Sequence, residues 1–407
     1  MTLSTSPRPD SARLDVPHRA DIVVIGGGIV GAASAFFLRQ AGLHPVLVER
    51  APALGTATTA ASAHSVRAQF TEPENIAMML ESLRVFDRFS ETLGLPAAEA
   101  DIKFIRQGYL FASTHPDAPA TFAARVAAQH ALGLDDVVCL DGDEARAQFP
   151  WLASTITAAT FRAADGWLDG CRATECFARA SAAPLLLGTE VLTIERDRGR
   201  VSGVRTSRGR IATEHVVLAT GPFTGTLAGE KLPITLLRRN RLVVAPRPDI
   251  PPDAPMTIDA DTGAHWRPHQ GGALLAWARP EPASPPLHPV PPDPAFPDLI
   301  LRDPDGVGRL TPFWRDLGSD LKAEDLALTA GQYTVTPDHK PLIGPAAGTE
   351  GLWLHTGYSG HGIMGSPAGA RLLADLLAGR VLDEENPFRP GRFAAHTPPK
   401  TTERAIL

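Results

Sequence analysis

The sequence predicts a protein of mixed α/β and α+β fold, in which a parallel sheet covered by helices is combined with a region of antiparallel strands. Two observations predict this fold. Residues 21–49 have the pattern strand, glycine turn, helix and strand, which is the βαβ unit of a parallel sheet. Residues 236–279 alternate apolar and polar side chains, as half-buried antiparallel strands do. A chain of 407 residues is long enough for two or three domains.

The βαβ unit has clear boundaries. The β-branched run Asp21–Ile25 stops at glycines 26–28, a helix of small and apolar residues follows over 29–40, and Pro45–Glu49 forms the second strand. Because both strands are continuous apolar runs, both faces of the sheet are buried and helices must cover them.

The turn of this unit carries the spacing Gly26-x-Gly28-x-x-Gly31. The first glycine permits a tight turn, the second lets the backbone approach a pyrophosphate, and the third lets the helix pack on the strand. Glu49 ends the second strand 18 residues after Gly31, where a carboxylate accepts hydrogen bonds from a ribose. Together these residues predict a dinucleotide-binding site.

The remaining elements follow in order. We expect a helix over 74–90, a strand and a helix in 102–112 and 121–140, and three strands in 191–219. The antiparallel region should contain strands at 241–245, 264–267 and 273–278, and the last elements are a strand at 352–356 and a helix at 366–377. Residues 280–304 are too rich in proline for a central strand or helix; they form either a surface loop or a lid over a site.

Composition excludes several classes of function. The net charge of −6 gives no general attraction to nucleic acid or to anionic lipid. Three cysteines, Cys139, Cys171 and Cys176, make no disulfide framework at this length, and their spacing predicts no metal site. We find no apolar signal core in residues 1–20 and no apolar run of membrane-spanning length, so we expect a cytoplasmic protein.

Two stretches favour FAD over NAD as the dinucleotide. Residues 54–63, after Glu49, are small and carry hydroxyl groups that can lie against a pyrophosphate. Near the carboxyl terminus, Gly357-x-Ser-Gly-x-Gly362 precedes the helix at 366–377, whose N–H groups would face the negative charge that reduction creates on a flavin. Since a plain glycine-rich loop also accounts for the second stretch, an NAD-dependent dehydrogenase stays an alternative at this point.

With these stretches in place, the sequence resembles the FAD-dependent amine and amino-acid oxidoreductases of the D-amino acid oxidase superfamily. It is most similar to the branch of sarcosine oxidase, glycine oxidase and the sarcosine oxidase β-subunit. The resemblance rests on Ile22–Arg50, Ala61–Phe70, Gly331–Gly344 and Trp353–Leu377, which occur in the order of the family.

The resemblance implies a Rossmann-like FAD-binding domain interleaved with an antiparallel-sheet substrate domain. The FAD-binding domain would comprise residues 19–84, 150–233 and 331–386, and the substrate domain 85–149 and 234–330. Residues 1–18 would be a disordered tail and 387–407 a carboxy-terminal tail.

The resemblance also implies roles for cofactor-binding residues. The ADP half of FAD would be held by Gly26, Gly28, Gly31, Glu49 and Arg50, with Ala61 and Ser62 near the pyrophosphate, Val191 at the adenine and Gly221 at the end of a further cofactor-contacting strand. The isoalloxazine would lie beside Gly360, His361, Gly362, Ile363 and Met364.

Three residues are candidates for catalysis. Arg67 stands where relatives place an arginine that pairs with the substrate carboxylate, and Tyr333 where the sarcosine oxidase branch has an active-site tyrosine. His265 is placed to reach the pocket from a hairpin. For each of the three, a purely structural role is the alternative.

The implied reaction is oxidation of the C–N bond of a small amine or amino acid to an imine, by hydride transfer to flavin N5. The electron acceptor would be oxygen or an electron carrier. Two alternatives for the assembly stay open: the chain is a flavin-bearing subunit of a larger complex, or it forms a homo-oligomer. Gly331 replaces the cysteine that bonds the flavin covalently in monomeric sarcosine oxidases, so we expect non-covalent FAD, with His64 as the one residue near a histidyl-linked position.

Overall fold

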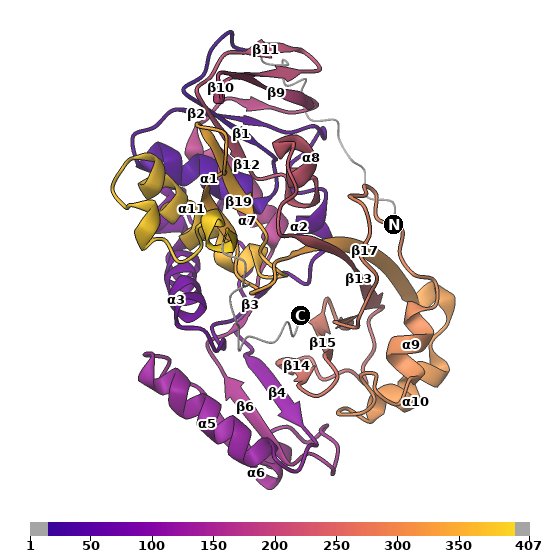
Figure 1. Ribbon diagram of the computed structural model, residues 1–407. Coiled ribbons are helices and arrows are strands. Elements are labelled where there is room, and N and C mark those ends of the chain that lie inside the picture. The colour runs from indigo at the N-terminus through magenta and orange to yellow at the C-terminus, as the bar shows by residue number, and fades with distance from the viewer. Residues whose placement is uncertain (1–14, 395–407) are drawn as a thin grey trace.

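The computed structural model describes residues 15–394 and contains two large sheets (Figure 1). The first has six strands in the order β18-β19-β12-β1-β2-β8. All neighbours are parallel except β18 and β19. Its strands are β1 (Ile22–Ile25), β2 (Pro45–Val48), β8 (Leu185–Leu186), β12 (His215–Leu218), β18 (Leu342–Pro345) and β19 (Leu352–Thr356).

Alternate residues of β1 enter two different cores, so both faces of the parallel sheet are covered. Ile22 and Val24 pack into a cluster with helices α1 (Ile29–Gln40), α3 (Pro73–Asp87), α4 (Phe89–Leu93), α7 (Gly170–Ser181) and α11 (Gly362–Leu377). Val23 and Ile25 pack on the opposite side against a three-stranded sheet and α8 (Thr224–Ala228).

The three-stranded sheet corrects one expectation. Residues 191–219 contain four strands rather than three: β9 (Val191–Asp197), β10 (Arg200–Thr206) and β11 (Gly209–Ile211) form this sheet, and β12 joins the parallel sheet. The missed strand β11 has only three residues and pairs with the end of β10.

The second large sheet has eight strands in the order β17-β13-β16-β15-β14-β4-β6-β5. The strands are β4 (Tyr109–Ser113), β5 (Val138–Asp141), β6 (Ala158–Arg162), β13 (Thr235–Val244), β14 (Met256–Asp259), β15 (Ala264–His269), β16 (Gly272–Trp277) and β17 (Leu326–Val335). It is mainly antiparallel, as predicted, with one parallel pair between β14 and β4. The helices α5 (Ala118–Ala131), α6 (Gly142–Gln148), α9 (Phe296–Arg302) and α10 (Phe313–Asp320) accompany it.

Strand register decides which side chains share a face of this sheet. Directly opposite partners point the same way, so Arg239 and Arg241 on β13 share one face with Tyr333 on β17 and His265 on β15. Residues of the other face, including Trp266, pack against α9 and α10. The first face is therefore free to border a site.

The expected domain boundaries stay a prediction, but two strands do not follow them. β6 lies in the eight-stranded sheet, although residues 150–233 were expected in the FAD-binding part. β17 is one continuous strand across the boundary at 330. Its long pairing with β13 keeps residues 326–335 in one sheet.

The proline-rich segment contains a helix that its sequence pattern does not predict. α9 begins at Phe296, and Pro297 lies in its first turn, where no backbone N–H is needed for an intrahelical bond. The shorter elements of the described chain are α2 (Thr58–Ala61), β3 (Ser65–Val66), β7 (Gly166–Trp167), and the 3₁₀ turns Gly221–Phe223, Ala323–Asp325, Asp383–Glu385 and Pro390–Phe393.

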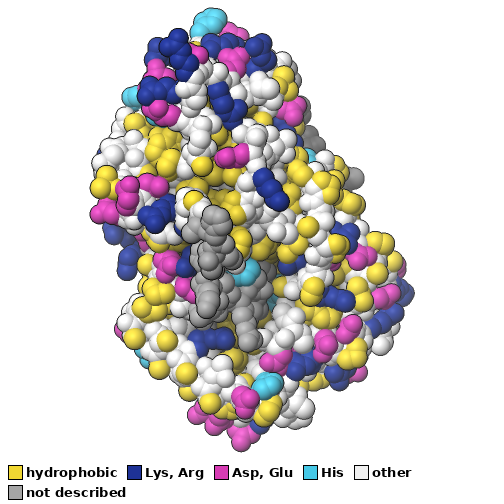
Figure 2. Space-filling view, in the orientation of Figure 1, with side chains coloured by type: hydrophobic (Ala, Val, Ile, Leu, Met, Phe, Trp, Pro, Cys, Tyr) yellow, Lys and Arg dark blue, Asp and Glu magenta, His cyan; other side chains and the backbone are white. Residues whose placement is uncertain are grey.

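Most of the two expected tails, 1–14 and 395–407, lies outside the described residues. The described parts are attached to the sheets: the Ala212 N–H donates to the His18 carbonyl at 2.9 Å, and the Ile343 N–H to the Phe388 carbonyl at 3.0 Å. Basic and acidic side chains are interspersed on the face drawn in Figure 2. Between residues 15 and 394 there is no helix of sufficient length and apolar character to cross a membrane.

Candidate active site

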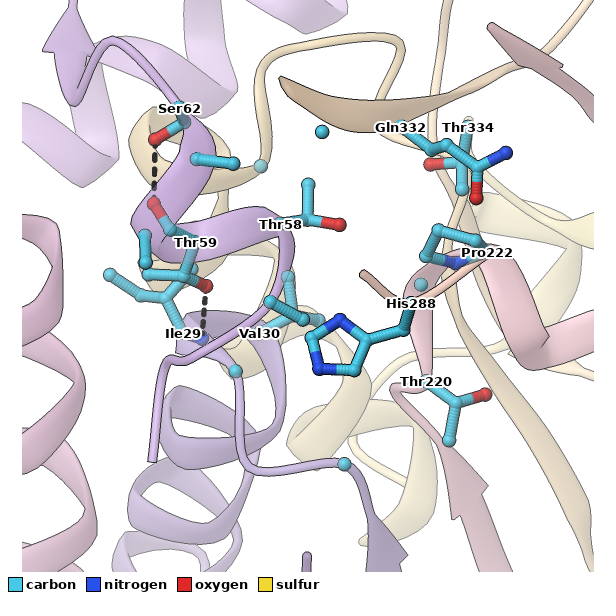
Figure 3. A pocket seen from close by; sticks show the side chains of 18 of the residues that line it. Ile29, Val30, Thr58, Thr59, Ser62, Thr220, Pro222, His288, Gln332 and Thr334 are labelled. Atoms are coloured by element: carbon cyan, nitrogen blue, oxygen red, sulfur yellow. Dashed lines mark hydrogen bonds between the residues drawn. The ribbon is translucent and has the colours of Figure 1, made fainter. Parts of the chain in front are cut away.

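A cavity of about 720 Å³ lies between the carboxyl ends of the parallel strands and the free face of the eight-stranded sheet (Figure 3). Most of the predicted site residues border it: Gly26, Gly28, Glu49, Arg50, Ala61, Ser62, Val191, Gly221, His265, Tyr333, Gly360, Gly362, Ile363 and Met364. Three predicted residues, Gly31, Arg67 and His361, do not. Segments far apart in sequence thus converge on one space.

The N-terminus of α1 opens into this cavity. Gly28 is its N-cap, without a side-chain capping bond, and its first turn carries no acidic residue. The Ile29 N–H donates to the Thr59 hydroxyl at 3.2 Å, and both residues are seen together in Figure 3. The positive end of this helix and its N–H groups suit a phosphate group.

The three glycines of the turn have different surroundings. A Cβ on Gly31 would stand 1.8 Å from the Gly26 carbonyl oxygen, so this glycine permits helix–strand contact rather than bordering the cavity. A Cβ on Gly26, whose φ is +111°, would stand 2.4 Å from the Ala219 carbonyl oxygen. A Cβ on Gly28 would meet only the Thr59 hydroxyl, at 3.3 Å, and would otherwise project into the cavity.

Glu49 and Arg50 stand at the end of β2 beside the same turn. The Glu49 carboxylate accepts the Gly27 N–H at 2.5 Å and the Ala51 N–H at 2.8 Å, one on each oxygen. Since a carboxylate has further lone pairs, it can also accept ribose hydroxyls. The Arg50 guanidinium lies 4.0 Å from the centre of the Phe223 ring.

A second helix N-terminus opens into the cavity. α11 begins at Gly362, its N-cap His361 makes no capping bond with its side chain, and no acidic residue lies in its first turn. Gly362, Ile363 and Met364 all border the cavity. A space with two such helix ends fits a cofactor that has a pyrophosphate and a ring system that becomes negative on reduction, which FAD has.

The free sheet face supplies the opposite wall. Tyr333, His265 and Arg241 border the main cavity, and with Arg239 they also border a small annex of about 30 Å³ beside Ser62 and Gly331. Arg241 donates through one terminal nitrogen to the carbonyls of Ala60 and Ser62, at 2.8 Å each, and so fixes the end of α2. Neither arginine was singled out from the sequence, although both lie in the alternating stretch 236–279, where their spacing was a usable signal.

His265 is neutral and keeps one acceptor. Its Nδ1–H donates to the Gly263 carbonyl at 2.9 Å, which leaves Nε2 as the ring's acceptor. Burial is the main reason that the pKa of His265 falls to about 4, and the nearby Arg239 charge contributes in the same direction. At neutral pH the imidazole is therefore uncharged.

Arg67 and His361 lie behind the cavity wall. Arg67 is 2% exposed, donates to the Gln69 carbonyl, and stacks 3.8 Å from the centre of the Phe70 ring. The ring of His361 packs edge-on against Phe70, with 4.8 Å between centres. Neither side chain borders the cavity, and the expected contacts of Arg67 with a substrate and of His361 with the flavin stay predictions.

His64 also borders the cavity, but both of its ring nitrogens are occupied. Nε2 donates to the Thr59 carbonyl at 2.9 Å, and Nδ1 accepts the Gly170 N–H at 3.2 Å. Burial is the main reason that the pKa of His64 falls to about 4.

We therefore expect FAD to be released when the purified protein is precipitated with acid. Gly331 offers no thiol, and His64 offers no free nitrogen for a covalent bond. Absorbance of the supernatant at flavin wavelengths measures the released fraction. Flavin that stays in the pellet would contradict non-covalent binding, and loss of that retention in a His64→Ala variant would identify the linking residue.

The comparisons with known proteins agree with FAD as the cofactor. The family described as FAD dependent oxidoreductase matches residues 21–376. Glycine oxidase of Geobacillus kaustophilus is 27% identical over 373 residues, covering 88% of this chain and 93% of that protein. FAD-dependent oxidoreductase domain-containing protein 1 of Xenopus laevis is 28% identical over 414 residues, covering 89% and 79%.

Among solved structures, L-proline dehydrogenase from P. horikoshii superposes with a TM-score of 0.79 and 25% identity, covering 93% of this chain and 99% of that one. The fold, FAD as the cofactor and the resemblance to the glycine and sarcosine oxidase branch are thereby confirmed, and the alternative of an NAD-dependent dehydrogenase is excluded. The chain belongs to the FAD-dependent oxidoreductase family.

Proposed function

We propose that this protein oxidises the C–N bond of a small amine or amino acid to an imine. The observation that carries the proposal is the charge distribution around the cavity. Glu49 and Glu190 are the carboxylates among the described residues that border it, and both lie at the end expected to hold the ADP half. The sheet face opposite α11 carries Arg239 and Arg241 instead.

This distribution selects the protonation state of the substrate. A protonated amine beside Arg239 and Arg241 meets like charge, and no carboxylate of the described lining offsets it. The pKa of a bound amine is therefore lowered, and the neutral free base is favoured. The neutral His265 can accept an N–H of this amine through Nε2 and so orient the adjacent carbon.

Bound FAD supplies a two-electron acceptor for the hydride that leaves the carbon next to the nitrogen. The chain's own contribution is to hold that carbon between the sheet face and the start of α11, and to keep the amine neutral. Tyr333 closes the pocket beside Arg239, whose guanidinium lies 5.5 Å from the centre of its ring. Water then hydrolyses the released imine to a carbonyl compound and ammonia or a smaller amine.

We further propose that Arg239, rather than Arg67, pairs with the carboxylate of an amino-acid substrate. One terminal nitrogen of Arg239 donates to the carbonyls of Arg238 and Arg279, at 3.1 and 3.0 Å. Its Nε is buried without a hydrogen-bond partner, and between residues 15 and 394 no carboxylate lies within ion-pair distance of it. A buried guanidinium with an unused N–H donor at the annex can bind the carboxylate of a substrate.

A screen for dye reduction without oxygen tests the proposed function. Small primary and secondary amines and their amino-acid counterparts should reduce the dye, whereas alcohols and hydroxy acids of the same carbon skeletons should not. Reduction by the hydroxy compounds alone would contradict C–N oxidation. Activity of the isolated chain would separate an enzyme from a subunit that needs partners, and repetition with oxygen as acceptor would distinguish an oxidase from a dehydrogenase.

A further inference from the structure

The proline-rich segment contains a stretch, residues 283–293, that forms part of the cavity wall; we call it the strap. Leu287, His288, Pro289, Val290 and Pro292 border the cavity that also contains the N-terminus of α1. Figure 3 shows the His288 side chain in the pocket with Val30, Thr58 and Pro222 nearby. The strap thus runs from the eight-stranded sheet to the part of the cavity beside the parallel strands.

The composition of the strap explains why it needs anchors. Five of its eleven residues are proline, which have no backbone N–H and cannot form a regular ladder. One ladder contact remains at its start, where Ala283 pairs with Leu237 and the Ser284 N–H donates to the Leu236 carbonyl at 3.1 Å. Side chains must therefore hold the rest.

Gln332 is the main anchor. Its side-chain Nε2 donates to the Ser284 hydroxyl at 2.8 Å and to the Pro285 carbonyl at 2.7 Å, and its Oε1 accepts the Leu287 N–H at 2.8 Å. The residue is 1% exposed, so the amide makes these bonds away from water. A second anchor holds the far end, where the Asp293 N–H donates to the Asn240 side-chain oxygen at 2.8 Å.

The position of Gln332 in the chain connects the strap to the site. Gln332 borders the cavity itself, together with its neighbours Gly331 and Tyr333 in β17 (Figure 3). A change in its amide bonds therefore acts first on Leu287 and His288, the strap residues that follow directly on the bonded atoms.

We propose that Gln332 is a positioning residue that fastens the strap across the FAD cavity, so that the strap slows the release of bound FAD. The cofactor cannot leave past Leu287 and His288 until these bonds open. This inference rests on the FAD site and not on the proposed C–N oxidation, so either can fail without the other.

The test measures FAD dissociation from the holoenzyme by the rise in flavin fluorescence after rapid dilution to a concentration at which released FAD does not rebind. Gln332→Ala should release FAD at least about tenfold faster than the unchanged protein, because three hydrogen bonds of the strap are lost. Iodide should quench the remaining bound flavin more strongly, and thermolysin should cut before Leu287 more rapidly. If Gln332 only stabilised the fold, Gln332→Ala would instead lower the unfolding temperature and leave iodide quenching unchanged at temperatures where the protein is folded.

Gln107→Ala is the matched control. This glutamine also donates its amide to a proline carbonyl, that of Pro252 at 2.8 Å, but it does not border the cavity. His288→Ala is the second variant, since it leaves all the anchoring bonds in place and removes only the side chain seen in the pocket. It should release FAD faster than Gln107→Ala.

Dissociation rates and iodide quenching equal to those of Gln107→Ala in both Gln332→Ala and His288→Ala would overturn the proposal. If Gln332→Ala does not fold, His288→Ala is the deciding variant. An FAD dissociation rate in His288→Ala equal to that of Gln107→Ala would then overturn the proposal.

Discussion

Gly28→Val should yield a folded protein that binds no FAD. The φ of Gly28 is −75°, a value that any residue adopts, so the substitution causes no backbone strain. Its side chain would project from a position that meets only the Thr59 hydroxyl at 3.3 Å, into the space where the backbone approaches the pyrophosphate. Absorbance of the purified variant and titration with FAD measure the loss.

Gly391→Val is the matched control for this change. A Cβ there meets no atom within 4 Å, and Gly391 does not border the cavity. This variant should be fully loaded with FAD. A fully loaded Gly28→Val protein would contradict the placement of the cofactor, whereas Gly31→Val should fail to fold, because its Cβ would overlap the Gly26 carbonyl oxygen.

Arg239→Met should reduce kcat/KM for an amino acid about ten- to hundredfold and leave that for the corresponding decarboxylated amine nearly unchanged. A charge-assisted bond to a carboxylate contributes roughly 1.5–3 kcal/mol, and only the acid makes it. Arg239→Lys should recover little, because an ammonium group cannot reproduce the planar fork of donors. The FAD content should stay the same in both variants.

Two further variants test whether the effect on the acid substrate is specific to Arg239. Arg302→Met, at a surface arginine paired with Asp298 at 2.9 Å, should leave both substrates unaffected. Arg67→Met should lower the unfolding temperature, since its guanidinium is buried against Phe70. A selective loss of the acid substrate in Arg67→Met and not in Arg239→Met would contradict our assignment and restore the role that the sequence predicts for Arg67.

The sequence predicts the cofactor side of the site well, because that side is built from local patterns. Gly26, Gly28 and Glu49 belong to one βαβ unit, and 28 residues of chain contain the turn, the helix and both strands from Ile22 to Glu49. Gly362 likewise begins the helix α11, which is the next element after β19 along the chain. Where neighbours in sequence are neighbours in space, spacing alone places the residues.

The substrate side depends on long-range register, which spacing does not give. Arg239 meets Tyr333 because β13 pairs with β17, almost a hundred residues later, and His265 joins them through β15 and β16. A shift of one residue in any pairing would turn these side chains to the opposite face. Arg67 shows the converse: it follows the small-residue stretch closely in sequence, but its side chain packs behind the cavity wall.

The central claim is that the chain oxidises an amine with its bound FAD, and anaerobic single-turnover absorbance tests it most directly. Mixing the oxidised holoenzyme with the best substrate of the dye screen should bleach the visible flavin absorbance band in step with formation of one carbonyl product per FAD. Deuterium on the carbon next to the nitrogen should slow the bleaching severalfold, because that C–H bond is broken. Bleaching that is absent with every amine and amino acid, yet complete with dithionite, would contradict the account.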